Sequence, residues 1–174
     1  MEKQKNTSYS IWVVPEGKAY EKLFSIIQDL GKKFNTSIFK PHVTVMVGYA
    51  PDENKAKKYT QILASRFRQF DVTLTRIEQR NEKFRSIFAV AESPELVRAE
   101  KESKKLFDVP KKYDDPVFHC SFLYGDVEEK RKTEHIEKLQ NLLPMKFKAV
   151  SFQLLEDRYY EMKWPEIAAY PLMR

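Results

Sequence analysis

Two short apolar stretches of the chain each carry a histidine and, two positions later, a hydroxyl residue. They read PHVTV over residues 41–45 and FHCSF over residues 118–122. Because the side chains of a β-strand alternate between its two faces, His42 shares a face with Thr44. His119 shares a face with Ser121 for the same reason. The opposite face of both stretches is apolar and can pack beneath helices, so the chain must build two strands that are polar on one side only.

The same order of elements occurs twice, namely strand, helix, strand, helix and strand, with one histidine stretch in each round. The expected strands are residues 9–14, 42–47, 70–77, 84–91, 118–124, 147–155 and 167–172. Apolar residues at helical spacing predict helices between them, the last over residues 128–143. A loop rich in Lys, Asp and Pro is expected over residues 108–116.

This repeat of order predicts an α+β fold. We expect a single domain over residues 1–174, made of two lobes that correspond approximately to the sequence halves 9–84 and 85–172. A pseudo-two-fold axis would relate the lobes. Each lobe would hold an antiparallel sheet with outer helices, and the two histidine strands would meet at a central cleft.

Composition narrows the class of protein. Hydrophobic residues make up 42% of the chain, enough for a core, and the net charge of +6 is compatible with an anionic ligand. The single cysteine, Cys120, allows no internal disulfide, and residues 1–8 lack the apolar core of a signal peptide. No apolar run approaches the roughly 18 residues of a membrane span. We therefore expect a cytoplasmic protein that does not associate with membranes.

The paired histidines suit phosphoryl chemistry. An in-line displacement at phosphorus needs a base for the attacking water and, on the opposite side, an acid for the leaving oxygen. Histidine performs both tasks near neutral pH. The hydroxyls of Thr44 and Ser121 can donate hydrogen bonds to the non-bridging oxygens as charge develops there. One such strand alone is typical of a structural histidine, whereas two in matching positions favour catalysis by His42 and His119.

We expect no metal and no other cofactor. The sequence contains no His-Glu-x-x-His motif and no paired-cysteine spacing, and its four glycines are too few for a Gly-rich phosphate loop. The third histidine, His135, lies on the polar flank of a predicted helix, and we expect it at the surface.

At the level of motifs, the chain resembles the 2H phosphoesterases, which carry twin His-x-Thr/Ser signatures. The similarity extends to SIWVVP over residues 10–15, KPHVTV over residues 40–45 and SFLYG over residues 121–125. These segments look like the plant and yeast branch of 2′,3′-cyclic-nucleotide 3′-phosphodiesterases. The resemblance implies a two-lobed fold with a water-filled cleft, two catalytic histidines and no metal. Plant members carry several cysteines able to form disulfides, so any redox regulation is not carried over to this chain.

The resemblance also implies substrates and further site residues. Thr44 and Ser121 would hold the phosphate oxygens, and Tyr124 matches an aromatic position at the family's active site. Trp12 and Phe84 look like the aromatic positions that flank the ligand, although a core position is an alternative for Trp12. The implied reactions open ADP-ribose 1″,2″-cyclic phosphate to the 1″-phosphate and nucleoside 2′,3′-cyclic phosphates to 2′-phosphates, as in the metabolism of tRNA-splicing by-products.

Two other functions remain open. The first is a relative that processes RNA ends, as a 2′,5′-ligase-like enzyme or an exonuclease, for which arginines near the histidine motifs would be the sign. Few arginines flank the motifs in the sequence, which favours a small substrate, with RNA as the less favoured partner. The second is a nucleotide-binding module without turnover, which the intact histidines disfavour. We expect a monomer, and the sequence does not decide which histidine is the base.

Overall fold

The computed structural model describes residues 7–111 and 117–174, so residues 1–6 and part of the loop expected over 108–116 lie outside the described residues. The strands are β1 (Thr7–Val13), β2 (Val43–Ala50), β3 (Phe70–Gln79), β4 (Ile87–Glu92), β5 (His119–Leu123), β6 (Met145–Ala149), β7 (Ser151–Glu156) and β8 (Glu166–Pro171). The helices are α1 (Gly17–Phe34), α2 (Glu53–Ala64), α3 (Pro94–Ser103), α4 (Glu129–Gln140) and the short 3-10 helix η2 (Tyr159–Glu161). The predicted α+β class is confirmed.

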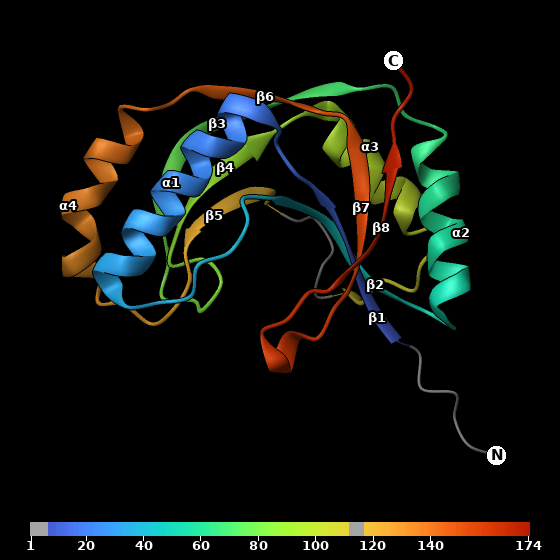
Figure 1. Ribbon diagram of the computed structural model, residues 1–174, viewed down its shortest axis with the longest axis horizontal. Helices are drawn as coiled ribbons and strands as arrows, with labels where there is room; N and C mark the ends of the chain where they lie inside the picture. The colour runs from blue at the N-terminus through green and yellow to red at the C-terminus, as the bar shows by residue number, and fades with distance from the viewer. Residues whose placement is uncertain (1–6, 112–116) are drawn as a thin grey trace.

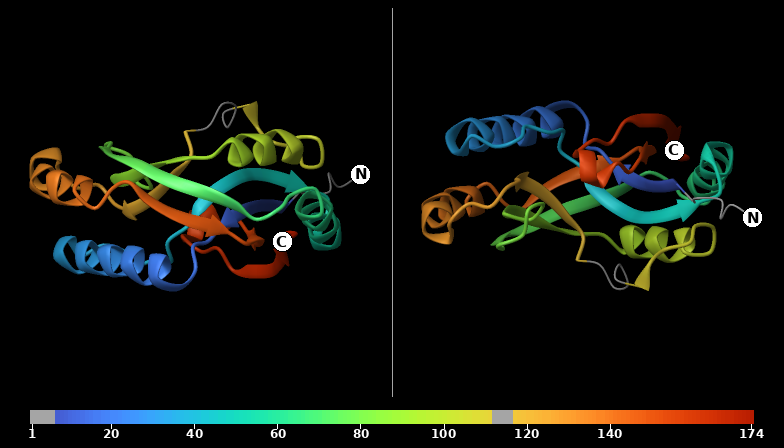
Figure 2. Two further views of the ribbon diagram at one scale, coloured as in Figure 1. Left: turned by 90° about the horizontal axis from the view of Figure 1, so that it is seen from above. Right: turned by 90° about the horizontal axis from the view of Figure 1, so that it is seen from below.

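All eight strands join in one curled antiparallel sheet with the order β6-β3-β4-β5-β2-β1-β7-β8. The first four strands form one lobe and the last four form the other (Figures 1 and 2). The lobes join where β5 meets β2 through a single registered pair, Val43 with Cys120, which we call the seam pair. The sequence predicted one sheet in each lobe, whereas the pairing of β2 with β5 joins both lobes in a single sheet. Both side chains of the seam pair are buried, so the core is continuous between the lobes.

The lobes are not the sequence halves 9–84 and 85–172. Each lobe takes strands from both ends of the chain, because β1 pairs with β7 and β3 pairs with β6. Each lobe is also covered by two helices that are not consecutive halves of the chain's helices. Helices α1 and α4 cover β5 and β3, whereas α2 and α3 lie against β7, β8 and β2 (Figure 1). The pseudo-two-fold relation therefore applies to the sheet, with β2 matching β5 and β1 matching β4.

The segment 147–155, expected as one strand, is two strands that belong to different lobes. Strand β6 ends at Ala149, where it pairs with β3, and β7 starts at Ser151, where it pairs with β8, and continues along β1 from Gln153. Phe147 and Ala149 are buried in one lobe, and Phe152 and Leu154 in the other. The alternation of apolar residues shifts by one position at the break, from odd-numbered to even-numbered residues, and this shift was overlooked because apolar residues recur on both sides of it.

Candidate active site

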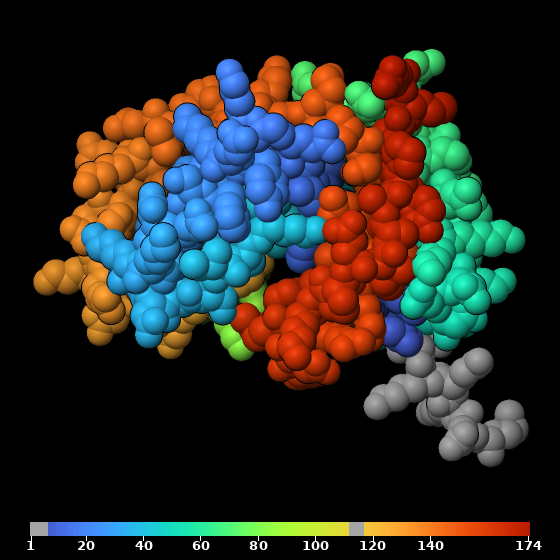
Figure 3. Space-filling model, viewed as in Figure 1, coloured from blue at the N-terminus to red at the C-terminus, as the bar shows by residue number. Residues whose placement is uncertain are grey.

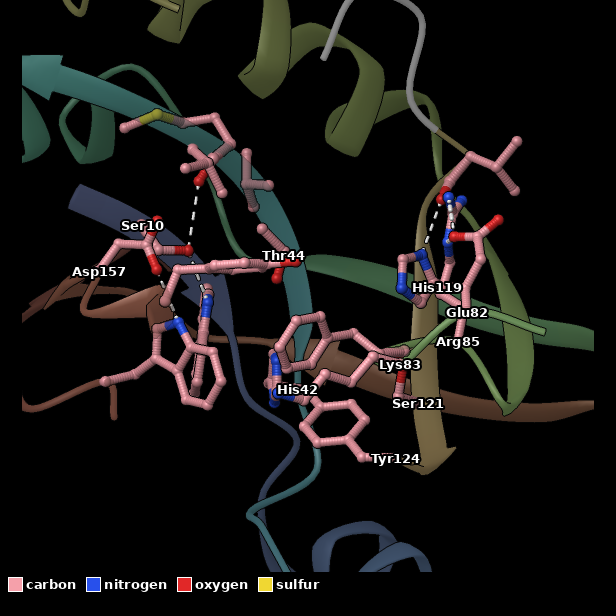
Figure 4. Close-up of a pocket in the computed structure, with 18 of the residues that line it drawn as sticks. Ser10, His42, Thr44, Glu82, Lys83, Arg85, His119, Ser121, Tyr124 and Asp157 are labelled. Atoms are coloured by element: carbon pink, nitrogen blue, oxygen red, sulfur yellow. Dashed lines mark hydrogen bonds and ion pairs between the residues drawn. The ribbon is translucent and has the colours of Figure 1, made fainter. Parts of the chain in front are cut away.

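The seam pair places the two histidine motifs side by side. His42 directly precedes β2 and His119 opens β5, one residue away from the seam pair on either strand. Because the strands are antiparallel, this register sets His42 across from Ser121 and Thr44 across from His119. All four side chains project from the sheet face opposite to that of the buried seam pair. The four side chains of the two motifs therefore line one cavity (Figure 4).

This cavity has a volume of about 730 Å³. Every site residue expected from the sequence lines it: His42, His119, Thr44, Ser121, Tyr124, Trp12 and Phe84. The opposite wall comes from the segment between β7 and β8, which contributes Asp157, Tyr159 and Trp164. Figure 3 shows the surface hollowed between this red segment and the light-blue stretch that follows α1.

The two imidazoles are held in the same way. Nδ1 of His42 lies 2.8 Å from the carbonyl oxygen of Lys40, and Nδ1 of His119 lies 2.9 Å from that of Val117. A carbonyl oxygen can only accept, so Nδ1 carries the hydrogen in both rings. Nε2 is thus left as the proton-accepting atom of each neutral imidazole. Both rings have the tautomer that a base or, once protonated at Nε2, an acid requires.

The pKa of each histidine lies below its ordinary value. Burial lowers the pKa of His42 from 6.5 to about 3; the hydrogen bond to the backbone of Lys40 opposes this shift, and the charges of His119 and Lys40 add to it. The pKa of His119 is lowered mainly by burial, and also by the charges of Arg85 and Arg80. Both rings are therefore neutral at pH 7 in the free protein. A phosphate anion between them would favour their charged forms and raise both values.

The hydroxyl of Ser121 is tied to the neighbouring loop. Its Oγ donates a hydrogen bond of 2.6 Å to the carbonyl oxygen of Phe84. In the same region the backbone N–H of Gly125 donates to the carbonyl oxygen of Lys83 over 2.7 Å. The β3–β4 loop is thus fastened to β5 beside His119. For Ser121 to donate to a phosphate oxygen, its hydroxyl must rotate away from Phe84.

Tyr124 reaches the cavity because β5 contains a bulge. Ile87 pairs with Leu123 and Phe88 with Ser121, so β5 uses one residue more than β4 at this point. An extra residue reverses the alternation of side chains beyond it, which turns Tyr124 to the face of His119. A regular strand would have pointed Tyr124 the other way. Its ring stacks on Phe39, with ring centroids 3.7 Å apart, and contacts Phe84 edge-on at 5.1 Å.

Trp12 lies flat against a histidine. Its ring is stacked on the imidazole of His42, with centroids 3.5 Å apart and an angle of 9° between the planes. The side chain is only 5% exposed and is tilted against Trp164, with the ring centroids 6.1 Å apart. His42 thus occupies one face of the indole that was expected to flank the ligand.

Three cations of the β3–β4 loop, Arg80, Lys83 and Arg85, also line the cavity. The sequence suggested few arginines near the motifs, and the structure corrects this, because the loop folds across to β5. Nε of Arg85 binds Glu82 Oε2 at 2.8 Å. The fully buried Lys132 of α4 donates to the carbonyl oxygen of Arg80 over 3.0 Å and so fixes the start of the loop. Nothing in the local pattern of the sequence indicates these long-range contacts.

His135 is less exposed than its position on α4 predicts. Its side chain is 15% exposed and lies edge-on against Phe34, with ring centroids 5.5 Å apart. It does not line the cavity. Among residues 7–111 and 117–174, no three His, Cys, Asp or Glu side chains group in a way that could hold a metal ion. In the same residues, no helix is long and apolar enough to cross a membrane.

Comparisons with known proteins agree on one family. A family profile described as "Cyclic phosphodiesterase-like protein" matches residues 7–154. The chain is 26% identical to the cyclic phosphodiesterase of Arabidopsis thaliana over 144 residues, which are 82% of this chain and 78% of the plant protein.

Solved structures share the fold. LigT of E. coli in complex with phosphate superimposes with a TM-score of 0.58 at 12% identity, over 97% of this chain and 99% of LigT. Usb1 of Kluyveromyces marxianus gives a TM-score of 0.54 at 11% identity, over 95% of this chain and 98% of that one. With the family match over most of its length, this chain belongs to the cyclic phosphodiesterase-like proteins of the 2H phosphoesterase family and is a phosphodiesterase.

Proposed function

We propose that this enzyme opens cyclic phosphates by hydrolysis, with His42 and His119 as the acid and base and without a metal ion. The observation that carries the proposal is the register at the seam, which brings both imidazoles to one cavity with Nε2 of each ring as the proton-accepting atom. One ring would take a proton from water, and the other would give one to the leaving oxygen. Thr44 and Ser121 would bind the non-bridging oxygens.

The proposed substrates are ADP-ribose 1″,2″-cyclic phosphate and nucleoside 2′,3′-cyclic phosphates. Support comes from the similarity to the plant cyclic phosphodiesterase and from the aromatic walls of the cavity, where Tyr124 and Phe84 offer ring surface near the phosphate site. Solved structures of LigT contain ATP, 3′-AMP and NADP+, which are ligands of a related kind. Such a role would fit the removal of tRNA-splicing by-products in the cytoplasm.

A second candidate substrate is the cyclic phosphate at the end of an RNA chain. The cations Arg80, Lys83 and Arg85 beside the histidines favour it, because a longer ligand has further phosphates for them to bind. Against it, Glu82 forms ion pairs with both arginines. A small cyclic phosphate thus remains the preferred substrate. The small substrates and the RNA end should be compared in one assay.

The product of ring opening tests the assignment. Two fixed imidazoles can align only one of the two ester oxygens of the ring with the acid, so we expect a single product isomer. 2′,3′-Cyclic AMP should give the 2′-phosphate, and the ADP-ribose compound should give the 1″-phosphate. 3′,5′-Cyclic AMP should react poorly, because its scissile oxygen is misplaced. Phosphorus NMR of the products, with a short RNA that ends in a 2′,3′-cyclic phosphate in parallel, measures this.

The same assay should proceed unchanged in excess EDTA. Loss of turnover on chelation that a divalent ion restores would contradict the proposal. So would a mixture of 2′- and 3′-phosphates. Turnover of the RNA end at a higher kcat/KM than the small substrates would move the assignment to the second candidate.

The pH dependence of kcat/KM should be shifted to the acid side. In the active form of the free enzyme, one imidazole is protonated and acts as the acid while the other is neutral and acts as the base. Because the pKa of both rings is lowered, an imidazole becomes protonated only at low pH. We therefore expect the optimum below the ordinary histidine value of 6.5 and a decline of up to about tenfold per pH unit above it. An optimum above pH 7 would contradict the lowered pKa values of the two histidines in the free enzyme.

A further inference from the structure

The two histidines lie in matching places but have different aromatic neighbours. In the β1–β2 ladder Trp12 pairs with Thr44, and a register shift follows the motif. In the β4–β5 ladder Phe88 pairs with Ser121, again next to a register shift. Trp12 and Phe88 are therefore equivalent under the pseudo-two-fold relation of the sheet. Each of these aromatic residues contacts the histidine of the adjacent motif strand.

The two contacts differ in geometry. Trp12 covers the face of His42 in parallel at 3.5 Å, whereas Phe88 meets His119 edge-on at 5.2 Å and 66°. The face of an aromatic ring carries negative potential and attracts a cation placed over it, and indole does so most strongly. A positively charged His42 would thus be stabilised by its neighbour. Phe88, by contrast, does not lie parallel to His119 and does not cover the face of that ring.

Two hydrogen bonds hold the indole of Trp12 in its plane. Nε1 of Trp12 donates to Oγ of Ser10 over 2.7 Å, and Oγ of Ser10 donates to the carbonyl oxygen of Met46 over 3.3 Å. Ser10 is 1% exposed, so an indole that turned away would leave a buried hydroxyl with one partner fewer. On the other side His42 is held by its Nδ1 bond to Lys40. The stacked pair is therefore anchored at both rings.

We propose that Trp12 is a positioning residue, which holds the imidazole of His42 and stabilises the imidazolium that His42 becomes during turnover. Whether His42 acts as acid or as base, it carries a proton at Nε2 at one stage of the reaction. The inference rests on the proposed function, in which both histidines transfer protons. It also explains how two histidines in equivalent places of the fold can have different acid–base properties, because their aromatic neighbours differ.

Other charged and titratable groups act on His42 and must be kept constant in a test. They are Lys40, whose backbone holds the ring and whose charge lowers the pKa of His42, and His119 across the seam, whose charge also lowers it. Nζ of Lys40 also lies 5.7 Å from the centroid of the Trp12 ring and competes for the same negative potential. Trp12 has two opposing effects on the pKa of His42. By burying the ring it disfavours the charged imidazole, and through the negative potential of its face it favours the charged imidazole. A simple truncation would change both effects at once.

Fluorinated tryptophan separates them. Fluorine on the indole weakens the negative potential of its face with little change in shape, so burial of His42 is preserved. The experiment incorporates tryptophan with one to four ring fluorines at position 12, by suppression of a stop codon, in the full-length protein. The pKa of His42 is followed by nitrogen NMR in the presence of saturating inorganic phosphate, and kcat for 2′,3′-cyclic AMP is measured in parallel.

We expect the pKa of His42 to fall stepwise with each fluorine, by about one unit over the series, as befits a desolvated cation–π contact. The pKa of His119 should stay constant. Fluorination of Trp164, the other tryptophan, is the matched control and should leave the pKa of His42 unchanged, because Trp164 contacts Trp12 and not the imidazole. The value of kcat should decrease in the order of the pKa series.

A pKa of His42 that does not respond to fluorination at position 12 would overturn the inference, as would an equal response to fluorination at position 164. The proposed function is tested separately by the His42→Ala variant. If that variant keeps full activity, the two-histidine mechanism is wrong whatever the fluorine series shows. If it is inactive while fluorination has no effect, only the role of Trp12 is wrong.

Discussion

His42→Ala and His119→Ala should each lower kcat for a cyclic phosphate by about 10²–10⁴-fold, the usual cost of losing a general acid or base. Each imidazole has Nε2 as its proton-accepting atom at the shared cavity, and no other histidine lines it. The double variant should be little slower than the worse single variant, because the two rings act in one displacement. Steady-state assays of the three variants at matched pH measure this.

His135→Ala is the control for the loss of a histidine as such. His135 packs on Phe34, away from the cavity, so kcat should be unchanged. A folded His42 or His119 variant that retained wild-type kcat would contradict the two-histidine mechanism. Retention of fold is checked by circular dichroism and by the urea midpoint of each variant.

The free energy of unfolding should fall as the pH is lowered below 6.5. The folded-state pKa of His42 is about 3 and its ordinary value is 6.5, so between these values the unfolded chain binds a proton that the folded chain does not. The stability that His42 contributes is present above pH 6.5 and is lost on acidification. From His42 alone the loss would be on the order of 5 kcal/mol at pH 3.

Urea unfolding of the wild type and of His42→Gln at a series of pH values isolates this effect. Glutamine does not titrate, so the variant should lose less stability between pH 6.5 and the acid limit than the wild type. The remaining slope in the variant comes from the carboxylates and from His119, whose pKa is also lowered by burial. Identical slopes in the two proteins would mean that folding does not change the pKa of His42.

The local pattern of the sequence was sufficient to predict the strands that carry the site. The alternation in residues 41–45 and 118–122 correctly predicts two one-sided strands that meet at the centre of the fold. Where the prediction failed, the reason was long-range pairing. The division at Val150 sends β6 to β3 and β7 to β1, and no glycine or proline signals it. A window of a few residues cannot identify a partner strand that lies more than 70 residues away.

Within the site, strand alternation alone does not place the side chains where the ladders shift register. The position of Tyr124 depends on one extra residue in β5, which is a property of its pairing with β4 and not of its own sequence. The contact of Trp12 with His42 likewise depends on the pairing of β1 with β2. The expectation that these aromatic residues lie near the reacting groups came from a resemblance to known enzymes, and the geometry of their contacts came only from the structure.

The exchange of strands between the lobes has a consequence for synthesis of the protein. Strand β1 leaves the ribosome first, yet its partner β7 comes from the last part of the chain, Ser151–Glu156. Neither lobe can complete its sheet until its last strand, β6 in one lobe and β8 in the other, has been made. Folding of each lobe must therefore wait for that strand and for the slow closure of long loops, so that the nascent chain exposes unpaired strand edges until then. A chaperone that shields these edges would act on this enzyme before it has any active site at all.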